Sequence, residues 1–287
     1  MPNVSCEVCG TGVTDRRLRD GSTLASCPQC SHVLRDLGQG PANHRSLAYG
    51  GDPGLDRVRL TLTFSSLRRL AELRPGQRVF EIGFGAGALL RRLLDSGVHV
   101  AGCDPDQLKV AVDEQVLAAG DIHATSIEAL GASVEPVDLV YGIHVIEHVE
   151  DIAVVARASH DLLVPGGQVA FMTPAADSWS LSAFSDAWWL LEDPTHIRFF
   201  SAASARRFLE DAGFVDVRVR RLLTDNLTME GASLLRLARP APRPGGVLET
   251  RRARIFATAV APFALVVRAL VPRWRPTMFI TARRGPA

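Results

Sequence analysis

The fold of this chain is decided by the stretch VFEIGFGAGALLRRL, residues 79–93. An apolar run with one acid, Glu81, leads into glycines at every second position, Gly83, Gly85 and Gly87, and an amphipathic segment follows. This order predicts a strand, a tight turn and a helix. Glycines in such a turn let a ligand approach the backbone at a helix N-terminus, which is typical of a nucleotide site.

The carboxylates around this turn indicate which ligand it takes. A dinucleotide fingerprint reads G-x-G-x-x-G, whereas this turn reads G-x-G-x-G with Glu81 two residues before the first glycine. A carboxylate there would repel a pyrophosphate but can accept hydrogen bonds from an ammonium group or an ordered water. A second acid, Asp104, ends the next strand pattern, HVAGCD, where it can accept both hydroxyls of a ribose. A ligand with a cationic amino-acid end and an adenosine end fits both acids.

Strand and helix patterns alternate along most of the remaining chain. Such alternation predicts an α/β fold, a Rossmann-like parallel sheet with helices on both faces. The expected strands are residues 78–83, 99–104, 138–143, 168–174, 215–223 and 277–284. The expected helices are residues 56–73, 86–95, 107–119, 145–163 and 201–214.

Four of the five cysteines, Cys6, Cys9, Cys27 and Cys30, crowd the first thirty residues. Their C-x2-C-x17-C-x2-C spacing matches the pattern in which four thiolates hold one tetrahedral zinc ion. The alternatives are two disulfides, which a chain without a signal-peptide pattern disfavours, and cysteines with no joint role. Four thiolates leave no open coordination position, so the zinc is expected to be structural. The ribbon is too small to bury its own core, so metal binding is expected to provide most of its folding energy.

Composition limits the function classes. The 287 residues are 47% hydrophobic and 22% charged, which is typical of a globular protein. The net charge of +1 gives no general electrostatic case for a nucleic-acid partner. The first ten residues have no apolar run of the kind that a secretion signal needs, so we expect a cytoplasmic protein.

Together these features resemble the class I S-adenosylmethionine-dependent methyltransferases over residues 60–224. VFEIGFGAG looks like the family's first motif, Asp104 like its ribose-binding acid, and DLVYGIHVIEHVED like its strand-four motif. The resemblance implies a seven-stranded sheet whose last strand runs antiparallel to its neighbour, with S-adenosyl-L-methionine as the cofactor. It also implies that Ser126 and Ile127, in ATSIEAL, contact adenine and that His144 belongs to the cofactor site.

Stretches outside the core narrow the resemblance. The cysteine ribbon and the segment DPTHIRFFSAASARRFLEDAGF are similar to bacterial methyltransferases of sugars, glycans and natural products. The VIEHV stretch resembles ubiquinone-pathway O-methyltransferases, which favours a hydroxyl on a small molecule or glycan as the acceptor. Alternatives are a sugar C-methyltransferase, an RNA methyltransferase that uses its ribbon to recognise RNA, and a non-catalytic binding module. No aromatic residue precedes Tyr49, which disfavours RNA.

The IHVIEHV stretch and His196 are expected to act at the acceptor. His144, Glu147 and His148 stand at i, i+3 and i+4, so on a helix they share one face, just past a strand end. We favour a metal-free general base, with His148 or His196 removing the hydroxyl proton beside Glu147, because histidine titrates near neutral pH. One alternative is a divalent metal on these four residues, by similarity to the E-x-x-E-H of ubiquinone-pathway and small-RNA 3′-end enzymes. Another is a purely structural His148.

Residues 251–274 form an apolar segment with arginines at its ends. Its uninterrupted apolar run is too short to span a bilayer. We expect it to pack on the core or on a second copy of the chain, as a monomer or homodimer, with weak contact to a membrane surface as the alternative. The predicted domains are a zinc ribbon at 1–38, a linker at 39–55 and a methyltransferase domain at 56–287 with an insertion at about 225–275.

Overall fold

The computed structural model describes residues 4–35, 52–105, 110–130, 134–238 and 245–286. They form two compact units, each assembled from separate stretches of sequence. The first unit contains Met1–Arg59, Pro174–Ser204 and Arg221–Met278, and the second contains Leu60–Thr173, Ala205–Arg220 and Phe279–Ala287. The predicted domains follow chain order, whereas the compact units do not. Residues 39–51 of the predicted linker lie outside the described residues.

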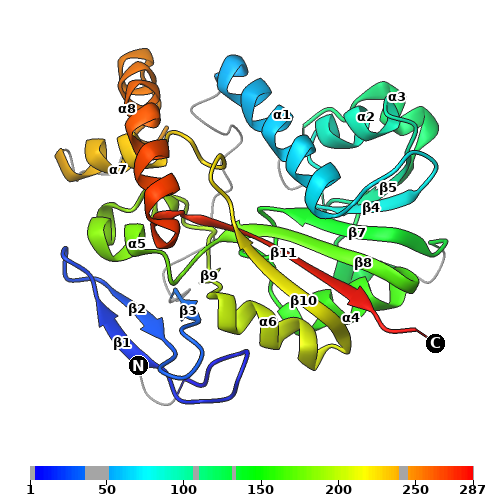
Figure 1. The fold of residues 1–287 in the computed structure, drawn as a ribbon, viewed down its shortest axis with the longest axis horizontal. Helices are drawn as coiled ribbons and strands as arrows, with labels where there is room; N and C mark the ends of the chain where they lie inside the picture. Colours follow the sequence, from blue (N-terminus) through cyan, green and yellow to red (C-terminus); the bar gives the residue numbers. More distant parts are fainter. Residues whose placement is uncertain (1–3, 36–51, 106–109, 131–133, 239–244, 287) are drawn as a thin grey trace. The chain divides into compact units, whose positions relative to one another are not determined.

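A seven-stranded sheet forms the centre of the second unit (Figure 1). Its order is β10-β11-β8-β7-β4-β5-β6, and the strands from β8 to β6 pair in parallel. Leu222 N–H donates to Thr277 O (3.0 Å), so the end of β10 meets the start of β11 and these two strands are antiparallel, as predicted. The strands are β4 (Arg78–Ile82), β5 (His99–Cys103), β6 (Asp121–His123), β7 (Val137–Ile143), β8 (Leu163–Pro174), β10 (Phe214–Arg221) and β11 (Thr277–Arg284).

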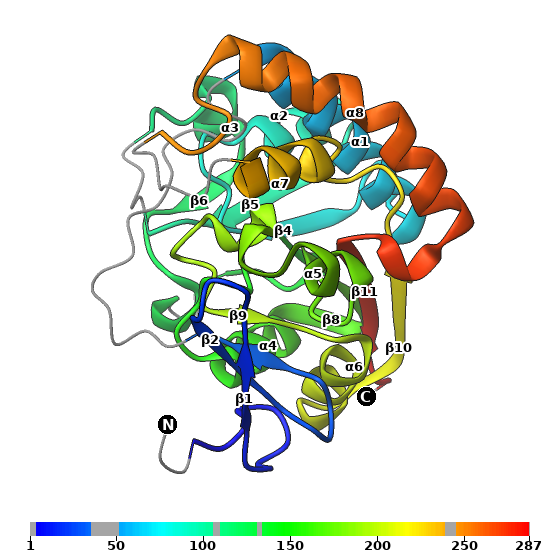
Figure 2. The same ribbon diagram turned by 90° about the vertical axis from the view of Figure 1, so that its left-hand side faces the viewer.

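Helices cover both faces of this sheet, which confirms the predicted Rossmann-like architecture. Figures 1 and 2 show α2 and α3 on one side of the sheet and α4 and α6 on the other. Because both faces are covered, the central strands are mostly apolar, and Phe80, Val140 and Phe171 are fully buried. The helices are α1 (Pro53–Leu70), α2 (Ala88–Leu94), α3 (Glu114–Ala119), α4 (Ile152–Leu162), α6 (Ala202–Asp211) and the short 3₁₀ helix η2 (Ile127–Ala129).

Two of these helices begin later than their sequence patterns predict. The pattern for α3 starts at residue 107, but Asp113 caps the helix by accepting hydrogen bonds from the N–H groups of Gln115 and Val116. The pattern for α4 starts at residue 145, but the helix begins at Ile152, and Asp151 caps it in the same way. In both cases an aspartate that satisfies the first helical N–H groups sets the boundary.

The first unit joins the ribbon to segments from the C-terminal half of the chain. Its antiparallel sheet has the order β1-β2-β3-β9, so a strand that follows His196 completes the sheet of the ribbon. Leu24 and Val33 of the ribbon share a buried apolar cluster with Trp188 and with residues of α7 and α8. The elements are β1 (Thr14–Arg17), β2 (Thr23–Ser26), β3 (Val33–Leu34), β9 (Arg198–Phe199), α5 (Trp179–Phe184), η3 (Ser185–Ala187), η4 (Trp189–Leu191), α7 (Met229–Ala238), α8 (Arg251–Leu270) and η5 (Pro272–Trp274).

The helices α7 and α8 form the insertion between β10 and β11. Their backbones approach closely, since a Cβ placed on Gly231 would lie 2.4 Å from Ala257 Cα. The helix α8 extends past its apolar run at both ends. Among the described residues it is the one helix whose length and composition would allow it to cross a membrane. The most apolar 18 residues of α8 have a mean hydropathy of 1.7, and 22% of this stretch is buried.

Candidate functional site

The carboxyl ends of β4, β5 and β7 define the candidate site. In an open parallel sheet, ligands bind outside the carboxyl ends of the strands, at the point where the strand order reverses. The chain passes from β4 to β5 and β6 on one side, and then through β7 and β8 on the other. The reversal therefore lies between β4 and β7, next to the glycine turn.

The three glycines of this turn each have a left-handed backbone, with φ of 73° at Gly83, 54° at Gly85 and 76° at Gly87. Such φ values are costly for other residues. A Cβ on Gly83 would also lie 2.8 Å from Val145 Cγ2, so that glycine permits close contact with the loop after β7. A Cβ on Gly85 would meet no described atom within 4 Å. Gly85 thus borders open space, as a backbone that receives a ligand must.

Asp104 joins the loops after β4 and β5. Its Oδ2 accepts a hydrogen bond from Gly85 N–H (2.8 Å), and its own N–H donates to His123 O (3.1 Å) at the end of β6. A carboxylate can accept several hydrogen bonds at once. The same side chain can therefore hold the glycine turn in place and bind the hydroxyls of a ligand.

Glu81 is nearly buried, with 4% of its surface exposed, at the end of β4. Its Oε2 accepts a hydrogen bond from the hydroxyl of Tyr141 (2.9 Å) on the neighbouring strand β7. Burial, and then the Glu81 carboxylate, raises the pKa of Tyr141 well above its usual value, so the hydroxyl remains a donor. The sequence pointed to Glu81 but not to Tyr141, because nothing in the pattern DLVYGI marks its tyrosine as polar.

Ser126 and Ile127 follow β6, at the start of η2. Ile127 is buried and Ser126 is half-buried, which suits an apolar wall with a polar edge. Their contact with adenine stays a prediction.

The turn after β7 differs from the prediction. Residues 144–150 are not helical: His144 has φ of 54°, a turn follows, and α4 begins later, at Ile152. His144, Glu147 and His148 therefore do not share a helix face. Instead, His144 Nδ1 lies 3.1 Å from Glu147 Oε1 and Thr173 Oγ1 donates to Glu147 Oε2 (3.0 Å). Glu147 is fully buried and His148 is half-buried.

His196 belongs to the first unit, whereas Glu147 and His148 belong to the second, so their predicted cooperation stays a prediction. The His196 ring is buried, and its Nδ1 lies 2.7 Å from Leu190 O. Because a carbonyl oxygen accepts, Nδ1 carries the proton of this bond, and Nε2 is the basic nitrogen of the neutral ring. The ring of Phe199 packs edge to face with the His196 ring, and the two centroids are 6.0 Å apart.

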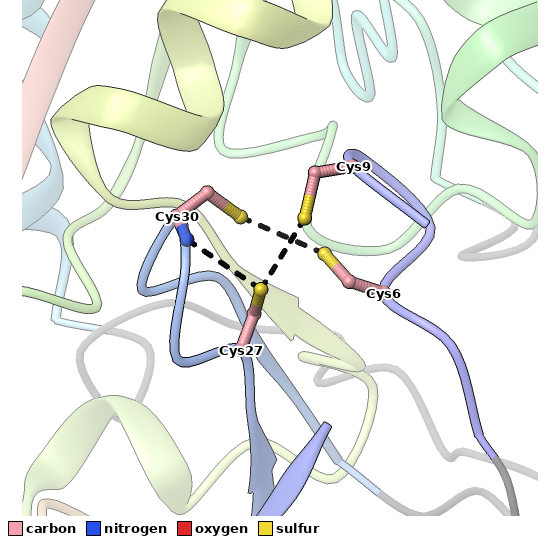
Figure 3. A group of neighbouring side chains, drawn as sticks. All are labelled: Cys6, Cys9, Cys27 and Cys30. Carbon is pink, nitrogen blue, oxygen red and sulfur yellow. Dashed lines mark hydrogen bonds between the residues drawn. The ribbon is translucent and has the colours of Figure 1, made fainter. Parts of the chain in front are cut away.

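The four ribbon cysteines converge, as Figure 3 shows. Their sulfur atoms all lie within 4.8 Å of one another, at 3.6 Å for Cys6 and Cys30 and 3.3 Å for Cys9 and Cys27. All are free thiols, so the disulfide alternative is not realised. A tetrahedral zinc with sulfur ligands at about 2.3 Å separates its sulfurs by about 3.8 Å, and these positions fit it. Cys103 lies apart in β5, where burial raises the pKa of its thiol to about 12.

The ribbon binds the segment after His196 through polar groups that the sequence did not reveal. His32 Nε2 lies 2.8 Å from Glu7 Oε1 and its Nδ1 lies 3.2 Å from Ser204 Oγ. Arg198 Nε donates to Glu7 Oε1 (2.7 Å), and Ser201 Oγ donates to the carbonyl oxygen of Cys30. The cysteine loops and residues 198–204 therefore form one network, in which Cys30 is a candidate metal ligand.

A family model described as a methyltransferase domain matches residues 56–219, more than half of the chain. Together with the loops at the carboxyl ends of β4, β5 and β7 (the strand-end loops), this match shows that the chain belongs to the S-adenosylmethionine-dependent methyltransferase family. The ribbon lies outside the matched residues.

Curated relatives include ubiquinone biosynthesis O-methyltransferases. That of Burkholderia pseudomallei (strain K96243) is 33% identical over 159 residues, which are 51% of this chain and 68% of the relative. That of Stutzerimonas stutzeri is 32% identical over 149 residues, 48% of this chain and 64% of the relative. That of Ruegeria pomeroyi is 38% identical over 106 residues, 35% of this chain and 43% of the relative. The chain thus spans less than two thirds of the last two proteins.

Solved structures share the fold at low sequence identity. Phosphoethanolamine N-methyltransferase 2 of Haemonchus contortus, solved with S-adenosyl-L-methionine, has a TM-score of 0.53 and 18% identity, covering 78% of this chain and 52% of that one. The cyclopropane synthase MmaA2 of Mycobacterium tuberculosis has a TM-score of 0.55 and 15% identity, covering 87% and 100%.

Proposed function

We propose that the protein transfers a methyl group from S-adenosylmethionine to a hydroxyl group of a small molecule. The observation that carries this proposal is the bond between Asp104 and Gly85, which joins a ribose-binding acid to the glycine turn. The names of the O-methyltransferase relatives support a hydroxyl acceptor. We favour sugars, glycans and natural products as acceptors. We also propose that the enzyme is cytoplasmic and needs no nucleic acid.

The proposed chemistry divides between binding and proton removal. Glu81 and Asp104 bind the cofactor, Ser126 and Ile127 line its adenine, and His144 borders it. S-adenosylmethionine supplies an activated methyl group to the acceptor, whose hydroxyl must lose its proton during transfer. Positioning provides much of the rate in such a reaction.

His196 and His148 are the proposed bases. The bond from His196 Nδ1–H to Leu190 O fixes the ring, so Nε2 is the atom that would take the proton. His148 follows Glu147, whose carboxylate is held by His144 and Thr173. Glu147 is therefore a positioning residue for this turn.

We also propose that Cys6, Cys9, Cys27 and Cys30 bind one structural zinc ion. The convergence of four thiols, and their spacing, support this site. Elemental analysis of protein purified without chelator should give about one zinc per chain. Unmodified protein that is folded but contains no zinc after this purification would contradict the site.

The acceptor class is tested with methyl-labelled S-adenosylmethionine. The purified protein is incubated with phenols, sugars and nuclease-treated or untreated cellular RNA, and each fraction is counted and its methylated product examined by NMR. An O-methyl resonance in a small-molecule product is expected. Label that enters RNA, and is lost after nuclease treatment, would replace this proposal with RNA methylation, and a C-methyl product would correct the atom.

A further inference from the structure

The helix α8 exposes an unusually apolar face. Ile255, Phe263, Val266 and Leu270 are 55%, 76%, 58% and 77% exposed, and Phe256 is 43% exposed. At 3.6 residues per turn, these side chains occupy one continuous arc of about 100°, and at 1.5 Å per residue the stripe from Ile255 to Leu270 is about 22 Å long. An exposed stripe of this extent indicates an interaction surface.

The opposite face of α8 is fixed to the rest of the first unit. Arg268 is fully buried, and its guanidinium donates two hydrogen bonds of 2.7 Å to the carboxylate of Glu230 on α7. It also donates to the carbonyl oxygens of Asp225 (2.6 Å) and Asn226 (2.9 Å). Insertion of α8 across a bilayer would break this charge pair and carry the Arg268 guanidinium into an apolar medium, at a large cost. The helix is therefore built to lie along the protein with one face outward.

Positive charge flanks both ends of the stripe. Arg251 and Arg252 precede it, and Arg273 follows it in η5. The sequence contains no acidic residue after Glu249. Arg273 also lies over the ring of Trp179 (5.8 Å), which is half exposed, so an amphipathic aromatic residue stands at the C-terminal end of α8. Tryptophan with an apolar body and a polar edge is enriched at membrane interfaces.

We propose that α8 binds the surface of an anionic membrane, with its apolar stripe in the boundary between headgroups and acyl chains and its flanking arginines on lipid phosphates. An amphipathic helix with aromatic residues and basic flanks has this binding mode. A second copy of the chain fits less well. Paired α8 helices would bring arginines against arginines in either orientation, without acidic residues on the helix to neutralise them.

The apolar contribution is tested by sedimentation of the full chain with vesicles of phosphatidylcholine, alone or mixed with phosphatidylglycerol. The double variant Phe263→Ser/Leu270→Ser should bind mixed vesicles at least about tenfold more weakly, because two large side chains no longer enter the lipid. The matched control, Leu117→Ser/Val215→Ser, removes side chains that are 54% and 46% exposed elsewhere and should bind like the unmodified chain. Equal losses in both variants would overturn the proposal.

The electrostatic contribution is tested with Arg251→Gln/Arg252→Gln, against Arg218→Gln/Arg220→Gln on β10 as the control. The first variant should lose roughly thirtyfold in affinity for mixed vesicles, equivalent to about 1 kcal/mol per arginine. Added salt should weaken binding of the unmodified chain and have less effect on this variant. Vesicle binding that depends on neither phosphatidylglycerol nor salt would contradict the proposed contact with an anionic surface.

Two further measurements separate the rival occupants. Light scattering should show the same mass for the unmodified chain and for Phe263→Ser/Leu270→Ser. The stripe would instead be assigned to a second copy if the unmodified chain is a dimer that does not bind vesicles and the variant is a monomer. Vesicle-bound protein should be released by alkaline carbonate, and protein that resists release would indicate a spanning helix. Circular dichroism verifies folding, and methyl transfer does not enter the test.

Discussion

The strand-end loops of the second unit and the ribbon of the first hold their polar groups by different means. In the loops, Asp104 and Gly85 lie nineteen positions apart and are brought together by two adjacent parallel strands. In the ribbon, Glu7 meets Arg198 across 191 positions, through a sheet built from the N-terminal ribbon and β9. The comparison teaches that the proposed cofactor site is a local property of successive strand ends, whereas the ribbon and the segment after His196 depend on each other. Variants in the two regions should therefore change different quantities.

The largest expected effect is the loss of stability in Cys27→Ser. Zinc would bind weakly, and the free energy of unfolding should fall by on the order of 5 kcal/mol. That is less than the free energy of roughly 10–16 kcal/mol that zinc binding contributes to folding of an isolated zinc finger. The loss is smaller here because the ribbon keeps its apolar contacts with the rest of the first unit. Chemical denaturation and zinc analysis measure both changes.

The control for this variant is Cys103→Ala, which removes a buried thiol outside the cluster. It should keep its zinc. If S-adenosylmethionine affinity falls as steeply as stability in Cys27→Ser, under conditions where the protein stays folded, the cofactor site is not local to the second unit.

A second effect concerns turnover. His196→Ala and His148→Ala should keep cofactor affinity and lose about 10²-fold or more in kcat, since each removes a proposed base. His99→Ala, at the exposed start of β5, serves as the control. Normal rates in both variants would leave neither histidine a chemical role. Activity abolished by a chelator, in protein that still holds its ribbon zinc, would favour the divalent-metal alternative.

A smaller effect is expected from Tyr141→Phe. The buried carboxylate of Glu81 loses a donor, and the free energy of unfolding should fall by about 1–2 kcal/mol. Because the pKa of Tyr141 is raised in the folded state, the stability it contributes is present below the usual tyrosine pKa of about 10 and is lost as the pH rises beyond it. The difference in the free energy of unfolding between the unmodified chain and Tyr141→Phe should narrow above that pH.

The titration itself can be observed directly, since the chain contains two tyrosines. In a Tyr49→Phe background, tyrosinate absorbance should stay low until the pH is well above 10 or the protein unfolds. A normal titration of Tyr141 in folded protein would show that it is not buried against Glu81.

Much of the second unit could be predicted because its signals are local. The apolar strand patterns, the glycine turn and Asp104 can each be recognised from residues that lie close together in the sequence. The helix expected at 145–163 was wrong at its start. The spacing of His144, Glu147 and His148 fits a helix, but His144 adopts a left-handed backbone and Asp151 caps the helix that follows.

The contacts of the first unit could not be predicted from spacing. Nothing near Cys30 marks Ser201 as its partner, and Glu7 reads as a surface acid until Arg198 and His32 are placed beside it. The same holds for one pair in the second unit: Thr173 donates to Glu147, and the two residues come from segments with separate patterns. Such pairs depend on tertiary packing, which periodicity does not encode.

The central claim is that the strand-end loops of the second unit bind S-adenosylmethionine, and calorimetric titration of Asp104→Ala tests it most directly. Loss of a charge-assisted contact should weaken binding by roughly 1.5–3 kcal/mol, about 10- to 150-fold. Asp95→Ala, which removes an exposed carboxylate at the end of α2, should bind like the unmodified chain. Unchanged affinity in Asp104→Ala, or in Gly85→Val, where a side chain would enter the open space beside the turn, would contradict the account.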